Sequence, residues 1–184
     1  MGAAFASALL VLERPRVALL SIGEEAEKGN ELIREAHARL KAGHLNFIGN
    51  VEARELFSGR ADVVVCDGFT GNVALKVGEG LVEALEQMLR EELSAAVVSQ
   101  IGALFGRRAF ERFRRRVDYA EHGAAVLLGV GGLVLIGHGR SSARAVENGI
   151  AMAARLAQGR VMDHVVAALG GRAPEDPPRA KDRP

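Results

Sequence analysis

The segment of this chain with the most chemically useful side chains is Asp67-Gly68-Phe69-Thr70-Gly71-Asn72, which follows a run of valines at residues 63–65. The valine run predicts a strand buried on both faces, and a helix-compatible run begins at Val73. In an open α/β sheet, ligands bind just beyond the carboxyl ends of the strands. Glycines there let the backbone approach a ligand, and polar side chains at a helix amino terminus suit an anion. Taken alone, the segment narrowly favours an ordinary strand-to-helix loop with Asn72 as the N-cap.

Two further clusters of polar groups follow other predicted strands. Lys28-Gly29-Asn30 offers a cation and a backbone amide, and residues 138–142 offer the imidazole of His138 and the hydroxyls of Ser141 and Ser142. Recognition of a phosphoryl group requires N–H groups, hydroxyls and a cation placed together. Because each cluster would follow the carboxyl end of a strand, all three could face one crevice.

Each of these residues also has a purely structural explanation. Lys28 could be a solvated surface lysine, and Asn30 could cap a helix that begins at Glu31. Ser142 could cap the last long helix, and a histidine near an apolar strand, such as His138, is more often structural than catalytic. Cys66 is expected in the core and is rejected as a nucleophile, because nothing nearby would lower its pKa.

Composition narrows the classes of protein to which the chain could belong. Its 184 residues are 48% hydrophobic and 26% charged, which is typical of a globular domain, and a formal charge of +1 argues against a nucleic-acid-binding protein. The single cysteine favours a reducing cytoplasm, and no signal peptide or membrane-spanning run is recognised. The five histidines are scattered without metal-ligand spacing, so no zinc site is expected.

The apolar pattern predicts alternating strands and helices, and therefore an α/β fold with parallel units. Helices are predicted at residues 1–12, 31–40, 51–57, about 72–93, about 142–158 and 161–169, and strands at 17–22, 46–48 and 61–66. The strand at 61–66 is expected to be central. Leu32, Ala36 and Leu40 are expected on the packed face of the second helix, and Asn50 as the cap of the third.

A basic amphipathic helical segment is predicted at about residues 95–117, where apolar residues at helical spacing face arginines. One interpretation is an ordinary solvated face on a packed helix. The other, which we favour, is contact with a membrane surface or with an acidic carrier protein. The residues expected to make this contact are Phe105, Arg107, Arg108, Phe110, Arg112 and Phe113. Residues 171–184 hold four of the five prolines and are expected to form a disordered tail.

Five motifs in this order resemble those of the bacterial fatty acyl-ACP:phosphate acyltransferase family, over residues 1–156. They are Ile22-Gly23-Glu24-Glu25 with Lys28-Gly29-Asn30-Glu31, Asn46-Phe47-Ile48-Gly49-Asn50-Val51-Glu52-Ala53-Arg54, the segment from Asp62 to Lys76, Asp118-Tyr119-Ala120-Glu121, and His138-Gly139-Arg140-Ser141-Ser142-Ala143. Their co-occurrence is specific, whereas one motif would not be. The resemblance implies an enzyme that converts acyl-ACP and inorganic phosphate into acyl phosphate for phospholipid synthesis.

The resemblance also implies how the site residues are used. Phosphate would attack the thioester carbonyl directly, so no protein nucleophile and no cofactor is needed beyond the phosphopantetheine that carries the acyl group. Lys28 and Asn72 would contact phosphate or the oxyanion, and Asp67 and His138 would orient groups or transfer protons. The expected substrate-binding residues are Gly29, Asn30, Gly68, Thr70, Gly71, Ser141 and Ser142.

For the fold, the resemblance implies a three-layer α/β/α domain over residues 1–170 with a mainly parallel sheet, like isocitrate and isopropylmalate dehydrogenases or phosphotransacetylase. It also implies a homodimer in the cytoplasm or on the inner face of the membrane, near a membrane acyltransferase. The chain resembles only the carboxyl-terminal half of the family, as expected from truncation, a misplaced start codon or a split gene. Ala124, Val126 and Gly131 depart from the family's usual glycine, proline and asparagine.

Two other functions stay open at this point. A phosphotransacetylase-like enzyme acting on acyl-CoA would share the fold and the type of reaction. A noncatalytic dimerisation or membrane-docking remnant would share the ancestry without the activity.

Overall fold

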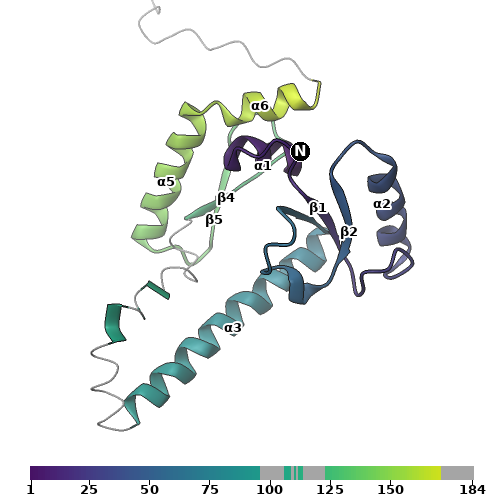
Figure 1. Ribbon diagram of the computed structural model, residues 1–184. Helices are drawn as coiled ribbons and strands as arrows, with labels where there is room; N and C mark the ends of the chain where they lie inside the picture. Colours follow the sequence, from purple (N-terminus) through teal and green to yellow (C-terminus); the bar gives the residue numbers. More distant parts are fainter. Residues whose placement is uncertain (96–105, 109, 111, 114–122, 171–184) are drawn as a thin grey trace, which may run out of the picture. The chain divides into compact units, whose positions relative to one another are not determined.

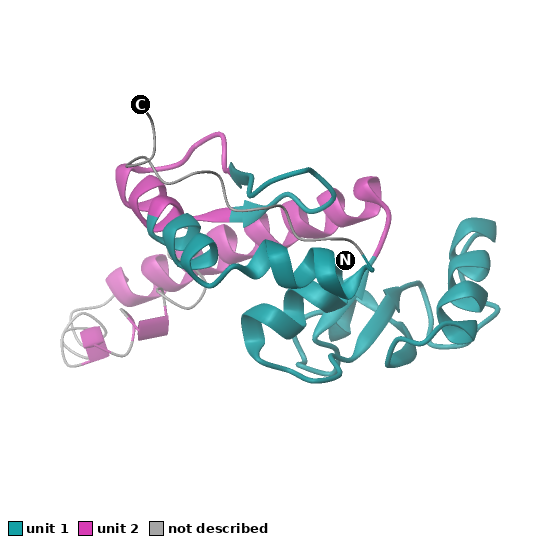
Figure 2. Cartoon of the chain, turned by 90° about the horizontal axis from the view of Figure 1, so that it is seen from above, with its two compact units in different colours: residues 1–65, 125–136, 151–184 teal, residues 66–124, 137–150 magenta. Residues whose placement is uncertain are grey.

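The computed structural model describes residues 1–95, 106–108, 110, 112, 113 and 123–170 (Figure 1). The expected disordered tail, Phe105 and residues 114–117 lie outside the described residues. The chain divides into two compact units (Figure 2). Unit 1 contains Met1–Val65, Ala125–Ile136 and Ala151–Pro184, and unit 2 contains Cys66–Ala124 and Gly137–Ile150.

The sheet of unit 1 has three parallel strands in the order β2-β1-β3. They are β1 (Val17–Leu20), β2 (Phe47–Val51) and β3 (Val63–Val65). All four residues of β1 are buried, because this strand has a neighbour on each side. The prediction of a parallel α/β arrangement is confirmed. The prediction that the valine run is a central strand buried on both faces is wrong, because β3 lies at the edge and Val65 is 39% exposed.

Two of the predicted amino-terminal helices are present in unit 1. Helix α1 (Gly2–Leu10) ends at Val11, which has left-handed backbone angles, rather than at the later proline. Helix α2 (Glu31–Ala42) is capped by Asn30, as expected, and contacts β2 and β1. Its buried residue is His37, whereas Leu32 is 60% exposed, so the predicted packed face was misplaced.

The remaining elements of unit 1 include one further correction. A helix with Asn50 as its cap was predicted at residues 51–57, but the structure has a single 3-10 turn, η1 (Ala53–Glu55), whose cap is Glu52. Asn50 instead lies inside β2 and is 1% exposed. Helix α6 (Val161–Ala168) packs on α1, and Val161 and Val165 are buried.

Unit 2 is built mainly from the long helix α3 (Gly68–Ser94), which has no buried residue. Strands β4 (Ala124–Val126) and β5 (Leu135–Gly137) form a two-stranded sheet, and helix α5 (Ala143–Gln158) follows. These last three elements contribute residues to both units. Among the described residues, no helix combines the length and the apolar character needed to cross a membrane.

The starts of β1 and β3 are joined by the pair Arg16 and Asp62. The Asp62 carboxylate accepts from the Arg16 backbone amide at 2.7 Å and from its guanidinium at 3.0 and 2.8 Å. In return, the Arg16 carbonyl accepts from the backbone amides of Asp62 and Val63. These bonds from Arg16 lower the pKa of Asp62 to about 2.

We therefore expect the Arg16–Asp62 pair to stabilise the fold in a pH-dependent way. Because the folded pKa of Asp62 lies below the unfolded value of about 3.9, its stabilisation is present above pH 4 or so. It is lost as the pH falls through the folded pKa. Urea unfolding of the wild type and of Asp62→Asn between pH 6 and pH 2 tests this. The difference in stability should shrink towards pH 2, and a constant difference would contradict the assignment.

Candidate functional site

Each of the three predicted polar clusters follows the carboxyl end of a strand, as the sequence indicated. The Lys28 cluster follows β1 in unit 1, Asp67 follows β3, and His138 follows β5. The Asp67 and His138 clusters both belong to unit 2. Two of the three clusters therefore share one compact unit, and the convergence of all three stays a prediction.

The Lys28 cluster occupies the loop between β1 and α2. Gly29 has φ of +93°, and a Cβ on it would lie 2.8 Å from Cγ2 of Ile33, so this position requires glycine. Asn30 Oδ1 accepts from the backbone amide of Ile33 at 3.0 Å, which is the capping role considered from the sequence. The Gly29 carbonyl accepts from Arg34 at 2.8 Å. Lys28 itself is exposed.

Ser21 is a residue that the sequence did not single out, at the carboxyl end of the central strand β1. It is 7% exposed, and its Oγ has no hydrogen-bond partner within the described part of the chain. A buried hydroxyl without a partner costs free energy, which an oxyanion bound at this strand end would offset. Only its burial could have revealed it, because serine is common at strand ends.

The Asp67 segment is helical rather than a turn, which corrects the prediction. Helix α3 begins at Gly68, and Asp67 is its N-cap, accepting from the Thr70 amide at 2.8 Å and from the Thr70 hydroxyl at 2.5 Å. These two bonds lower the pKa of Asp67, with the hydroxyl as the larger cause. A lowered pKa makes this carboxylate a weaker proton acceptor, so the geometry favours orientation over general base chemistry.

Gly71 has a steric reason to be glycine, because a Cβ there would lie 2.9 Å from the Cys66 sulfur. Cys66 itself was expected in the core but is exposed. Its pKa is raised, first by partial burial of the thiol and then by the neighbouring Asp67 charge. The rejection of Cys66 as a nucleophile therefore agrees with its surroundings. No contact lies within 4 Å of a Cβ placed on Gly68.

One face of α3 carries a polar stripe formed by Asn72, Lys76, Glu79 and Glu83. These residues are spaced three or four apart, so they share one helix face. Asn72 lies one turn, or about 6 Å along the axis, before Lys76. The Asn72 amide is exposed and makes no side-chain hydrogen bond within the described residues. Lys76 Nζ donates to Glu79 Oε2 at 2.8 Å, which is the main cause of the lowered pKa of Glu79.

The loop after β5 contacts this polar stripe through two side chains. His138 Nε2 lies 3.2 Å from Lys76 Nζ and 3.6 Å from Glu79 Oε2. Arg140 lies 3.4 Å from Glu83 Oε1. Within the loop, the Ser141 hydroxyl donates to the His138 carbonyl at 2.7 Å. These contacts fix the predicted residue His138 beside Lys76, which is a turn away from the predicted residue Asn72.

Each ring nitrogen of His138 faces a hydrogen-bond donor. The backbone amide of Arg140 donates to Nδ1 at 3.2 Å, and a backbone amide can only donate. The Lys76 ammonium, which also can only donate, lies 3.2 Å from Nε2. A neutral ring accepts from one of these two donors and carries its proton on the other nitrogen. The site thus presents an ammonium group and an exposed amide along one helix face, with an imidazole beside them, and the ammonium and the amide are hydrogen-bond donors that suit an oxyanion.

Lys76 is the main site residue that sequence reasoning missed. The signal was available, since Lys76 lies four residues after Asn72 in a helical segment. This spacing does not single out Lys76 when the helix is expected to begin near Asn72, because Lys76 would then be an ordinary residue of the second helical turn. Ser142, in contrast, caps α5 as expected: its hydroxyl accepts from the Ala145 amide at 3.2 Å.

The basic segment is described only in part. Residues 106–108, 110, 112 and 113 are helical, and the helical segment predicted over about residues 95–117 stays a prediction. Arg107, Arg108 and Arg112 are exposed, Phe113 is 50% exposed and Phe110 is half-buried. In the described part of the chain, no group of three or more histidine, cysteine, aspartate or glutamate side chains could hold a metal ion.

Comparisons with known proteins give a consistent result. A family model described as "Fatty acid synthesis protein" matches residues 1–164. A phosphate acyltransferase of Syntrophotalea carbinolica is 54% identical over 95% of this chain and 50% of its own length. The phosphate acyltransferase of Acidobacterium capsulatum is 53% identical over 85% of this chain and 47% of its own length. That of Thermodesulfovibrio yellowstonii is 48% identical over 92% of this chain and 49% of its own length. The chain spans about half the length of these curated relatives.

Proposed function

The chain belongs to the family of fatty acid synthesis proteins, and we propose that it forms part of an enzyme that transfers a fatty acyl group from acyl-ACP to inorganic phosphate. The product is an acyl phosphate, an acyl donor for phospholipid synthesis. The observation that carries this proposal is the identity of 54% with a phosphate acyltransferase over 95% of the chain. No metal and no cofactor is proposed beyond the phosphopantetheine of the carrier protein.

The proposed reaction is a direct displacement. An oxygen of phosphate forms a bond with the thioester carbonyl carbon, and the carbonyl oxygen becomes an oxyanion. The C–S bond then breaks, and the thiolate leaves with the carrier protein and takes up a proton. Phosphate is already an anion at neutral pH, so catalysis depends on positioning phosphate and stabilising the oxyanion.

The donors on the polar stripe of α3 support these roles. Asn72 and Lys76 would bind phosphate or the oxyanion, and His138, which lies beside Lys76, would orient groups or supply a proton to the departing sulfur. Asp67 and Thr70 would fix the start of the helix that carries Asn72. Lys28 and the buried hydroxyl of Ser21 would add contacts to phosphate from the end of β1.

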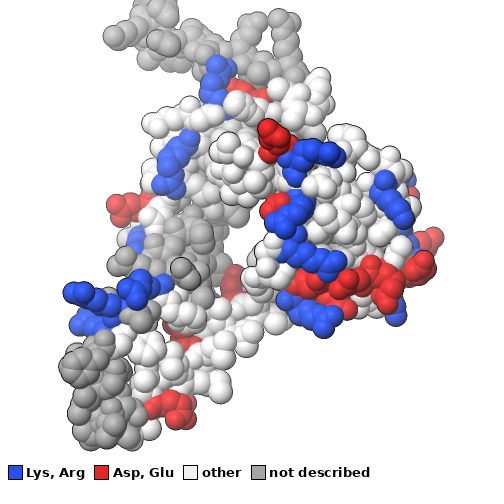
Figure 3. Space-filling view, in the orientation of Figure 1, with Lys and Arg blue, Asp and Glu red and all other residues white. Residues whose placement is uncertain are grey.

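The fold, partners and location follow from the same proposal. We propose a three-layer α/β/α domain, related to dehydrogenases of the isocitrate type or to phosphotransacetylase, that is completed by a further half. Exposed apolar residues of α3, among them Leu81 and Met88, support a homodimer, and residues other than Lys, Arg, Asp and Glu cover much of the visible face of this helix (Figure 3). Arg107, Arg108 and Arg112 with Phe113 support peripheral contact with acyl-ACP or an anionic membrane surface.

The proposal is tested by measuring acyl phosphate formation from palmitoyl-ACP and inorganic phosphate. The chain is assayed alone and after co-expression with the residues of the Syntrophotalea carbinolica relative that lie outside the matched half. We expect acyl phosphate with the second preparation at least, and a strong preference for acyl-ACP over acyl-CoA.

Two outcomes would replace the proposal by its alternatives. Faster turnover of a short acyl-CoA would favour a phosphotransacetylase-like enzyme. Absence of acyl phosphate in both preparations, with stable association of the two halves, would favour a noncatalytic module.

A further inference from the structure

We infer that His37 and Asn50 are positioning residues that hold residues 22–30, the Lys28 loop, in place. The inference concerns the same site as the proposed function, and the importance of the loop for phosphate rests on that function. The connection itself rests on a buried hydrogen-bonded chain from α2 through β2 to the loop. All of these residues belong to unit 1.

A bulge in β2 brings the two residues of the chain together. Val17 pairs with Phe47 and Leu19 pairs with Asn50, so two residues of β1 face three of β2. The extra residue coincides with Gly49, which has φ of +101°. In a regular strand, residues three apart point to opposite faces. With the extra residue, Phe47 and Asn50 both face α2.

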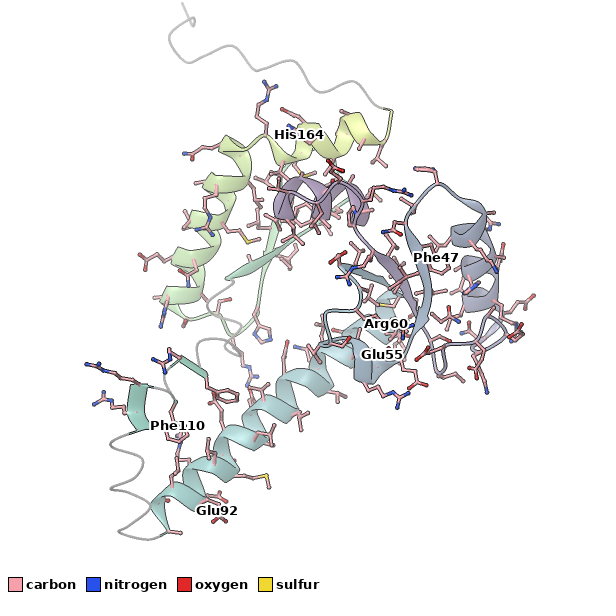
Figure 4. The ribbon with its side chains drawn as sticks, in the orientation of Figure 1. Phe47, Glu55, Arg60, Glu92, Phe110 and His164 are labelled. Atoms are coloured by element: carbon pink, nitrogen blue, oxygen red, sulfur yellow. The ribbon has the colours of Figure 1, made fainter. Side chains whose placement is uncertain are left out.

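His37 of α2 contacts both of these side chains. Its ring meets that of Phe47 edge-on, with centroids 5.1 Å apart at 78°, and Phe47 is labelled in Figure 4. Its Nδ1 lies 2.9 Å from Asn50 Oδ1. His37 is 8% exposed and Asn50 is 1% exposed, so water does not compete for this bond.

The other end of the Asn50 amide holds the loop. Asn50 Nδ2 donates to the Glu25 carbonyl at 2.8 Å. A carbonyl can only accept, so the Asn50 nitrogen must face Glu25 and its oxygen must face His37. The proton of a neutral His37 ring must then lie on Nδ1. His37 donates, Asn50 accepts through Oδ1 and donates through Nδ2, and the Glu25 carbonyl accepts.

The Glu25 carbonyl also accepts from the backbone amide of Lys28 at 3.1 Å. The acceptor held by Asn50 therefore closes the turn that carries the Lys28 side chain. The stem of that side chain lies against Gly23, where a Cβ would be 2.9 Å from Lys28 Cγ. Any movement of Glu25 would consequently displace Lys28.

A second attachment of the loop is weaker. Arg60 lies 3.2 Å from Glu24 and 2.5 Å from Glu55, and Figure 4 labels Arg60 and Glu55. The Arg60 and Glu24 side chains are 41% and 50% exposed, and such surface pairs contribute little. The buried His37–Asn50 pair is therefore a stronger restraint on the loop than this exposed pair.

Asn50→Asp is the sharpest test, because it changes one atom that faces Glu25. The aspartate still accepts from His37, but its second oxygen opposes the Glu25 carbonyl. We expect amide hydrogen exchange of residues 22–29 to accelerate about ten-fold or more, relative to the amides of β1. In the active preparation, KM for phosphate should rise more than kcat falls, because the loop binds phosphate.

Asn46→Asp is the matched control. Asn46 Nδ2 also donates to a backbone carbonyl, that of Arg14, at 3.0 Å, but at the opposite end of the strands. Asn46→Asp should leave both the exchange of the loop and KM for phosphate unchanged. An equal effect of the two variants would overturn the inference, as would unchanged exchange of the loop in Asn50→Asp.

A second pair of variants covers the case in which Asn50→Asp does not fold. His37→Leu removes the donor to Asn50, and His37→Gln retains an N–H group. Faster loop exchange in His37→Leu that is reversed in His37→Gln supports the inference, and equal rates in both overturn it. If the wild type makes no acyl phosphate, the proposed function fails, while hydrogen exchange still decides whether these residues position the loop.

Discussion

Alanine in place of Asn72 is expected to lower kcat/KM for acyl phosphate formation about 100-fold, the usual effect of removing one oxyanion donor. The free energy of unfolding should stay constant or rise by up to about 0.7 kcal/mol, because alanine favours a helix more than asparagine does. Asn72 is exposed inside α3, so its removal leaves no cavity. Steady-state kinetics and urea unfolding of the same preparation measure both quantities.

Gln87→Ala is the control for this variant, because Gln87 is another exposed amide on α3, in its later part. It donates to Glu91 and lies fifteen residues after Asn72, or about 22 Å along the helix axis. Its activity should match the wild type. If Asn72→Ala lost stability and activity in equal proportion, Asn72 would be a structural residue, and the site on α3 would lose its main support.

The start of α3 illustrates where sequence reasoning about this fold failed. Gly68 and Gly71 are common in turns, so the segment was interpreted as a loop that ends at Asn72. In the structure, Asp67 caps the helix through Thr70, three residues later, and both glycines become helical. A cap of this type outweighs the low helix propensity of glycine, and the preference depends on a side-chain bond that propensities alone do not include.

Strand order could not be obtained from the sequence for a different reason. The runs at residues 17–20 and 63–65 are both continuous and apolar, but only β1 is central. Pairing between strands far apart in the chain decides which run has two neighbours. His37 was missed similarly, because a buried histidine requires a partner, and that partner, Asn50, comes thirteen residues later after a bulge.

The types of residue at the site were more predictable than their partners. Asp67 and Asn72 follow the end of β3 in the parallel sheet, as the sequence indicated, whereas His138 follows the end of β5 in a separate two-stranded sheet. Lys76 was not predicted, since its contact with His138 spans 62 positions. Such a contact depends on how the loop after β5 meets α3, which no local pattern records.

The largest loss of stability is expected from Gly123→Ala. Gly123 has φ of +73°, where an alanine is strained, and the new Cβ would lie 2.7 Å from the Ala145 carbonyl oxygen and closer still to the Gly149 amide nitrogen. These are backbone atoms of α5, so no side chain can rotate away. We expect a loss of about 3 kcal/mol or more in the free energy of unfolding, or failure to fold, measured by thermal or urea unfolding.

Gly131→Ala, in the loop between β4 and β5, is the control and should leave stability unchanged, because its Cβ would meet nothing within 4 Å. Equal stability of the two variants would mean that residue 123 does not approach α5 this closely.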